Sequence, residues 1–119
     1  MNLDPISTDP DKYVVVFENE RVRVLEYTDS PGAATNPHAH PDSVMVTLSS
    51  FRRRLTLGEA QRDVDLPAGF VTWLPAQEHR GQNIGDTETR SIFIELKEPA
   101  PTSAGATMDG PPPLGPGVP

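Results

Sequence analysis

The chain contains no cysteine, and this absence removes several kinds of chemistry at once. It excludes disulfides, a thiolate metal site and a cysteine nucleophile. The chain also lacks an excess of basic residues. It has 10 Lys and Arg and 17 Asp and Glu, which gives a formal net charge of −7. This balance argues against nucleic acid or an anionic membrane as a partner.

Long apolar segments are missing as well. No run of apolar residues approaches the length needed to span a membrane. The first residues, Met1 to Pro5, lack the basic and then apolar regions of a signal peptide. From these absences we expect a cytoplasmic protein. A length of 119 residues corresponds to one domain with a modest core.

The segments that are present are short and β-like. They are rich in β-branched and aromatic residues, and no long segment has a helical period. The expected strands cover residues 13–17, 21–27, 44–48, 51–57, 63–66, 70–74, 79–83 and 91–96, with a further short strand around residues 38–40. Turn residues separate them every several positions, which is typical of an antiparallel sandwich or barrel. The expected fold class is therefore all-β.

The two ends of the chain differ from its middle. Residues 1–11 are polar and contain two prolines, so we expect a loosely held N-terminal arm. Residues 12–98 hold the strands and form the expected barrel. Residues 99–119 are rich in proline and glycine and cannot form regular hydrogen-bond ladders. Two alternatives stay open for this tail: a disordered or polyproline segment, or a strap on a neighbouring subunit, anchored by Leu114 and Val118.

The chain has only three histidines, and two of them lie one residue apart. His38 and His40 would point to the same side of a strand, because residues i and i+2 share a face. Two imidazoles aimed into one space suit a shared metal ion. The third histidine, His79, completes the site if it lies across the barrel from this pair. These three residues are the expected metal ligands.

The spacing around the histidines resembles the two motifs of a known family, the cupins. The matching residues are Gly32, His38 and His40 for the first motif, and Gly69, Pro75, His79 and Asn83 for the second. The resemblance covers about residues 13–97. It implies the cupin double-stranded β-helix, a jelly-roll-like conical barrel of two antiparallel sheets with metal inside. It also implies a homodimer, which would cover an open sheet edge near residues 13–17.

The chain departs from the family pattern at one ligand position. Four and five residues after the second histidine, where cupins usually place a glutamate, it has Val44 and Met45. In the second motif Gln77 stands where a glycine is usual. A site of three histidines therefore remains. It resembles the site of acetylacetone-type diketone dioxygenases and of thiol dioxygenases, which implies iron(II) as the cofactor; nickel, manganese, zinc and copper stay open.

Acid is expected to weaken such a site. An imidazole binds metal only when neutral, and its unperturbed pKa is about 6.5. With three histidine ligands, metal affinity should fall as the pH drops from about 7 to about 5, with up to three protons taken up.

Arg53 is a charge on an otherwise apolar strand face. With a period of two it shares that face with Phe51 and Leu55. An unpaired buried guanidinium would be costly, so it reaches solvent at the barrel mouth, meets an acid, or awaits an anionic substrate. Asn83 shares the face of His79. Arg53 and Asn83 are the candidate substrate-binding residues.

Two classes of function remain open. The first is a metal-dependent enzyme, such as a ferrous-iron dioxygenase, that acts on a small oxygenated or chelating metabolite. The second is a small-molecule-binding or structural barrel without chemistry. The sequence names no catalytic residue, and oxygen uptake with bound iron would separate the two classes.

Overall fold

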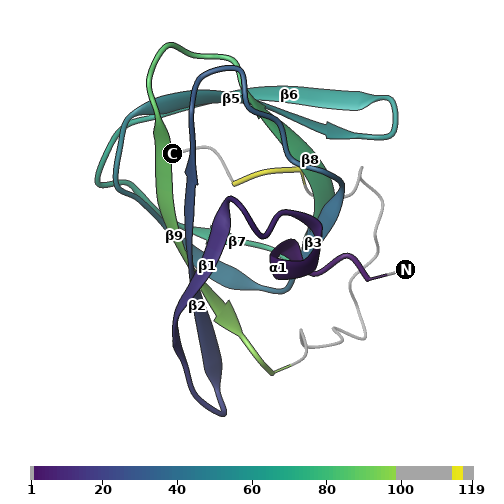
Figure 1. Cartoon of the computed structure of the whole chain (residues 1–119), viewed down its shortest axis with the longest axis vertical. Helices are drawn as coiled ribbons and strands as arrows, with labels where there is room; N and C mark the ends of the chain where they lie inside the picture. Colours follow the sequence, from purple (N-terminus) through teal and green to yellow (C-terminus); the bar gives the residue numbers. More distant parts are fainter. Residues whose placement is uncertain (1, 99–113, 117–119) are drawn as a thin grey trace, which may run out of the picture.

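The structure, a computed structural model, describes residues 2–98 and 114–116 (Figure 1). In chain order these residues form α1 (Pro5–Thr8), β1 (Tyr13–Glu18), β2 (Val22–Asp29), β3 (His38–His40), β4 (Ser43–Thr47), β5 (Phe51–Leu57), β6 (Ala60–Leu66), β7 (Val71–Leu74), β8 (Gln77–Asn83) and β9 (Thr89–Leu96). None of the helical structure in this part of the chain is long and apolar enough to cross a membrane.

The strands form two antiparallel sheets that face each other. One sheet has the order β1-β2-β9-β4-β7, and the other has the order β3-β8-β5-β6. The β5–β6 hairpin turns over two residues, and Gly58 has φ +58° there, a conformation that glycine adopts without steric cost. The expected all-β class and the barrel of two antiparallel sheets are confirmed.

The core fills the space between the sheets. Alternation is clearest in β8, where every second residue from Gln77 to Asn83 is buried. The buried apolar side chains are Tyr13, Leu25, Tyr27, Met45, Phe51, Leu55, Val64, Leu66, Leu74 and Phe93. Many inward positions are polar instead, including all three histidines and Arg53. The barrel therefore encloses a polar site within an apolar core.

The expectation that residues 1–11 form a loosely held arm is wrong. Asp4 caps α1, since its Oδ1 accepts the backbone N–H two residues later at 3.0 Å, and Pro5 occupies the first turn, where no N–H is needed. Pro5 and Asp9 are buried, and Asp9 Oδ1 accepts the backbone N–H of Asn36 at 3.0 Å. In Figure 1 the turn lies beside β3. The Asp-Pro pair was the sequence signal for this helical turn.

Three residues of the expected tail, 114–116, belong to the described structure. Leu114 packs against the core, and Gly115 and Pro116 are buried. One alternative for the tail placed Leu114 on a neighbouring subunit, but here it packs on its own barrel. The second expected anchor, Val118, lies outside the described residues.

Candidate metal centre

The three histidines meet at one point. β3 pairs with β8 so that His38 lies directly opposite His79, and His40 follows two residues later on the same face. The ring centroids are separated by 4.8 Å (His38–His40), 5.0 Å (His38–His79) and 5.3 Å (His40–His79). One ring nitrogen of each residue lies within 4.8 Å of the other two. The expectation that these residues come together is confirmed.

Burial keeps the three imidazoles neutral. Their exposed fractions are 1% for His38, 3% for His40 and 7% for His79. Burial lowers the pKa of all three, and the neighbouring histidines lower the pKa further for His40, to about 3, and for His79, to about 2. With the pKa of each ring lowered, the expected uptake of protons on metal release would occur at a lower pH than an unperturbed imidazole implies.

Two of the rings are oriented by hydrogen bonds from Nδ1. His38 Nδ1 lies 2.8 Å from the carbonyl oxygen of Asn36, and His79 Nδ1 lies 2.7 Å from Oε1 of Gln77. Both partners are acceptors, so Nδ1 carries the proton in each ring. This tautomer puts the lone pair on Nε2 of both rings, the atom at which each could bind a metal ion. Gln77, where the motif usually has glycine, thus has a structural role that the sequence did not reveal.

His40 has unsatisfied hydrogen-bonding capacity. Neither of its ring nitrogens has a hydrogen-bond partner among the described residues. Its Nδ1 lies 3.6 Å from Oε2 of Glu95, a carboxyl whose pKa is raised by burial and whose Oε1 accepts a hydrogen bond from Arg23 at 2.8 Å. A buried ring without partners is unfavourable, and a metal ion at Nε2 would satisfy it. The donor set therefore fits a metal ion.

No carboxylate joins the histidines. Among the described residues, the only group of three or more acidic, cysteine or histidine side chains close enough to share an ion is His38, His40 and His79. Met45, at a position where cupins usually have a glutamate, lines the cavity beside the site. The expected three-histidine set, without glutamate, is what the geometry brings together.

Tyr13 adjoins the site and was not foreseen. Its hydroxyl lies 3.4 Å from Nε2 of His38, and its ring packs edge-on to the imidazole. Burial raises the pKa of Tyr13 well above 10, so the hydroxyl keeps its proton and can donate it. β1 shows no alternation, since Tyr13 is buried and the other five residues are exposed, so nothing in the sequence indicated this contact.

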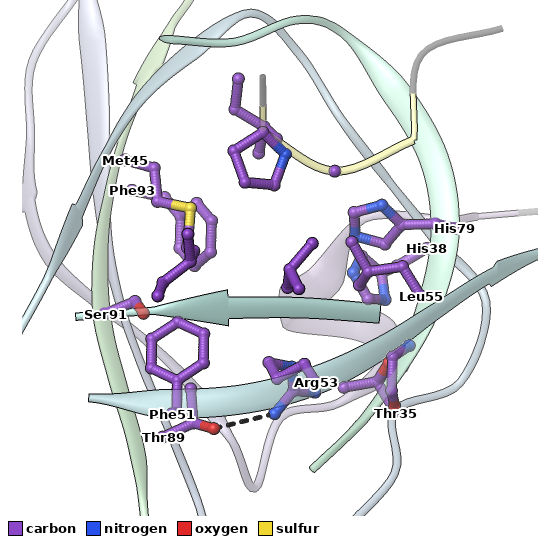
Figure 2. A pocket seen from close by; sticks show the side chains of 16 residues that line it. Thr35, His38, Met45, Phe51, Arg53, Leu55, His79, Thr89, Ser91 and Phe93 are labelled. Atoms are coloured by element: carbon purple, nitrogen blue, oxygen red, sulfur yellow. Dashed lines mark hydrogen bonds between the residues drawn. The ribbon is translucent and has the colours of Figure 1, made fainter. Parts of the chain in front are cut away.

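A cavity of about 50 Å³ opens beside His38 and His79 (Figure 2). On the usual requirement for one water, this volume would hold about three to five water molecules or a ligand of similar size. Most of its walls are apolar, formed by Met45, Phe51, Leu55, Val64, Leu66, Leu74 and Phe93. His40 is not among the lining residues. A ligand in this cavity would reach the histidines from the side of His38 and His79.

Arg53 lines the same cavity and is paired with an acid. Its Nη1 donates to Asp29 Oδ2 at 2.7 Å and to Thr89 Oγ1 at 3.1 Å, and its Nη2 donates to the hydroxyl of Tyr27 at 3.2 Å. Of the three alternatives raised by the sequence, the salt bridge is the one found. Its Nε and the second hydrogen of Nη2 make no hydrogen bond within the described residues, so two donors remain for a ligand. Figure 2 shows Arg53 across the cavity from Phe93.

Asn83 shares the buried face of His79, as expected, but its amide is engaged elsewhere. Its Nδ2 donates to Asp29 Oδ1 at 3.1 Å and to the carbonyl oxygen of Thr87 at 2.8 Å. Its Oδ1 accepts the backbone N–H of Gly85 at 3.1 Å. Asn83 is not a lining residue of the cavity. Through Asp29 it helps to fix the carboxylate that holds Arg53.

Replacing Gln77 with leucine is expected to weaken metal binding by about ten- to hundredfold, the usual effect of removing a group that orients a histidine ligand. The reason is the loss of the acceptor that fixes the His79 tautomer. The measurement is a competition titration with zinc. Gln82→Leu is the matched control, because Gln82 is exposed on the same strand. Equal affinities of the two variants would contradict the role given to Gln77.

The comparisons with known proteins agree with this geometry. The sequence matches no protein-family model and no curated protein. The fold matches a cupin domain from Bordetella pertussis Tohama I with a TM-score of 0.68 and 33% identity over 72% of this chain and 92% of the other. It also matches an uncharacterized conserved protein with a double-stranded β-helix domain from Klebsiella pneumoniae (TM-score 0.57, 21% identity, 71% and 76% covered). The polyketide cyclase RemF from Streptomyces resistomycificus matches with a TM-score of 0.57 and 17% identity, covering 87% and 68%, which shows the fold alone.

Proposed function

This chain belongs to the cupin superfamily, and from that membership we propose that it is a metal-dependent enzyme acting on a small oxygenated or chelating metabolite. His38, His40 and His79 hold one divalent transition metal ion. Iron(II) is the first choice, by the resemblance of the ligand set to that of ferrous dioxygenases. The observation that carries the proposal is the group of three buried, neutral histidines beside a partly enclosed cavity.

The ligand set suits an ion that takes part in chemistry. Three neutral imidazoles leave the charge of the ion intact, and when bound the ion would supply a Lewis acid with open positions for a chelating substrate or dioxygen. The apolar walls would exclude bulk water from a bound substrate. Tyr13 keeps its proton and can donate a hydrogen bond near His38.

Arg53 is the proposed substrate contact. Its guanidinium lines the cavity, and its Nε–H is free to donate to a substrate oxygen. Asp29 balances the charge of Arg53, and Asn83 holds Asp29 in place behind it. The arrangement favours a substrate with a carbonyl, enolate or carboxylate oxygen on the side away from the histidines.

Oxygen consumption tests the catalytic proposal. Iron(II)-loaded protein is supplied with small diketones and small thiol carboxylates in an oxygen electrode, with His79→Ala as the control. Uptake that requires iron and disappears in the control supports an oxygenase. Ligand binding without oxygen uptake or other turnover would support the alternative of a non-catalytic small-molecule-binding barrel.

We also propose that the chain is a homodimer, joined through the outer face of the five-stranded sheet. An uncharged row crosses this face from edge to edge, because the strand register aligns Phe17, Val24, Ile94, Val44 and Trp73. A two-fold interface brings the same surface of both copies together. The chain carries a net charge of −7, so an uncharged face is where two copies can approach with the least repulsion.

Replacing Trp73 with arginine is expected to produce a monomer. Trp73 is 47% exposed, and a buried interface tryptophan typically contributes about 2 kcal/mol or more, so the dimer should weaken at least about thirtyfold. Light scattering at micromolar concentration is the measurement. Gln82→Arg, on the outer face of the other sheet, is the control and should stay dimeric. A monomeric parent protein would contradict the proposal.

A further inference from the structure

Part of the wall of the histidine cavity comes from the segment Leu114 to Pro116. Gly115 and Pro116 line it together with His79 and Leu55, and both are buried. In Figure 1 this segment, coloured yellow, lies within the ring of strands near β8. The cavity is thus closed in part by a segment separated from the last strand by residues 97–113.

The barrel holds this segment through a specific arginine. Arg62, on β6, donates from Nη1 to the carbonyl oxygen of Leu114 at 3.1 Å and to that of Pro116 at 2.9 Å. Charge-assisted hydrogen bonds to two carbonyl groups hold the backbone on both sides of Gly115. Hydrogen bonds as well as apolar packing therefore hold the segment on the barrel.

The position between these carbonyl groups accepts only glycine. Gly115 has φ +76°, which side chains other than glycine rarely adopt. A Cβ atom there would lie 2.5 Å from Cδ1 of Leu55, closer than real Cβ contacts allow. A glycine at position 115 therefore allows the segment to pack against Leu55 in the wall of the cavity.

Gln77 connects the segment to a proposed metal ligand. Its Oε1 accepts the backbone N–H of Gly115 at 2.6 Å and lies 2.7 Å from Nδ1 of His79. One amide oxygen thus holds both the segment and the ring. Glycine, usual in cupins at the position of Gln77, could make neither contact.

We propose that Leu114–Pro116 is a lid that closes the histidine cavity and opens to admit ligands. This proposal depends on the proposed function only for the identity of the ligands that the lid admits. A three-residue contact held by few hydrogen bonds can open locally without unfolding the barrel. Because the lid is tethered to the barrel, it closes again rapidly. In the closed state it limits the cavity to about 50 Å³, so lid and cavity together select small ligands.

Histidine modification in the metal-free protein tests the lid. Diethyl pyrocarbonate reacts with neutral imidazole and must enter the cavity to reach His38 and His79, so its rate reports how often the lid is open. Arg62→Ala removes two hydrogen bonds and should raise the rate about tenfold. Gly115→Leu, which cannot fit against Leu55, should raise it at least as much. Mass spectrometry assigns the modified residues.

The control is Arg80→Ala, which removes an exposed arginine from β8 and should leave the rate unchanged. Rates equal to the parent rate in both lid variants, with circular dichroism unchanged, would overturn the proposal. An equal rise in the modification rate of His40, which does not line the cavity, would also overturn the lid proposal, because it would report a general loosening of the barrel. The experiment contains no metal, so failure of the metal proposal would leave its outcome intact.

Discussion

Replacing any one of His38, His40 and His79 with alanine is expected to lower metal affinity by more than about a hundredfold, beyond the ten- to hundredfold loss typical of residues that only orient a ligand. Each histidine supplies one of three donor atoms, and no carboxylate of the described residues belongs to this group. Competition titration with zinc gives the affinity. The barrel should still fold, because the sheets are held by a separate apolar core.

Circular dichroism of each variant checks the fold, and Gln82→Leu serves again as the exposed control. A histidine variant that keeps the parent affinity would remove that residue from the ligand set. A double variant of His38 and His40 that still binds a full equivalent would refute the site as a whole.

Lowering the pH from 8 to 5 is expected to destabilise the metal-free protein by about 4 kcal/mol, about 2 kcal/mol for each of two histidines whose pKa lies far below 6.5 when folded. The pKa is about 3 for His40 and about 2 for His79 in the folded chain. Between those values and 6.5, the unfolded chain binds protons that the folded chain does not, so stability falls as the pH falls. The raised pKa of Glu95 acts in the opposite direction and offsets part of the loss.

Denaturant unfolding at both pH values, in the presence of a chelator, measures this loss. His79→Gln removes one of the titrating groups and should cut the pH dependence by about half. A bound metal ion should restore stability, because it binds only the folded chain. Equal unfolding free energies at pH 8 and pH 5 would show that the histidines are not buried in the neutral form.

The sequence predicted the ligand set because the relevant signals are local. A spacing of two residues places His38 and His40 on one strand face, and motif spacing marks His79 as the third ligand. His79 lies on β8, the strand paired with β3 in the same sheet, and not across the barrel from the pair. Neither signal predicted the strand register that sets His38 opposite His79. This register brings the rings together. Alternation tells which face a residue occupies, but it does not tell which distant residue lies across from it.

The groups around the ligands could not be predicted for that reason. Glu95 faces His40 from a strand 55 residues later in the chain, and Gly115 reaches Gln77 from 38 residues away. Tyr13 is the one buried residue of β1, and nothing in the sequence of that strand indicated His38 as its neighbour. The pairing of Arg53 with Asp29 was one of three alternatives, and only the contact between β2 and β5 residues selects among them.

The central claim is that three histidines bind one metal ion, and X-ray absorption spectroscopy tests it most directly. The full chain, purified without a histidine tag, is loaded with one equivalent of zinc and measured at the zinc edge. Ligation by all three histidines predicts a first shell that contains three imidazole nitrogens, reduced to two in His79→Ala protein reloaded at high zinc concentration. A first shell with one imidazole or none in the parent protein would contradict the claim.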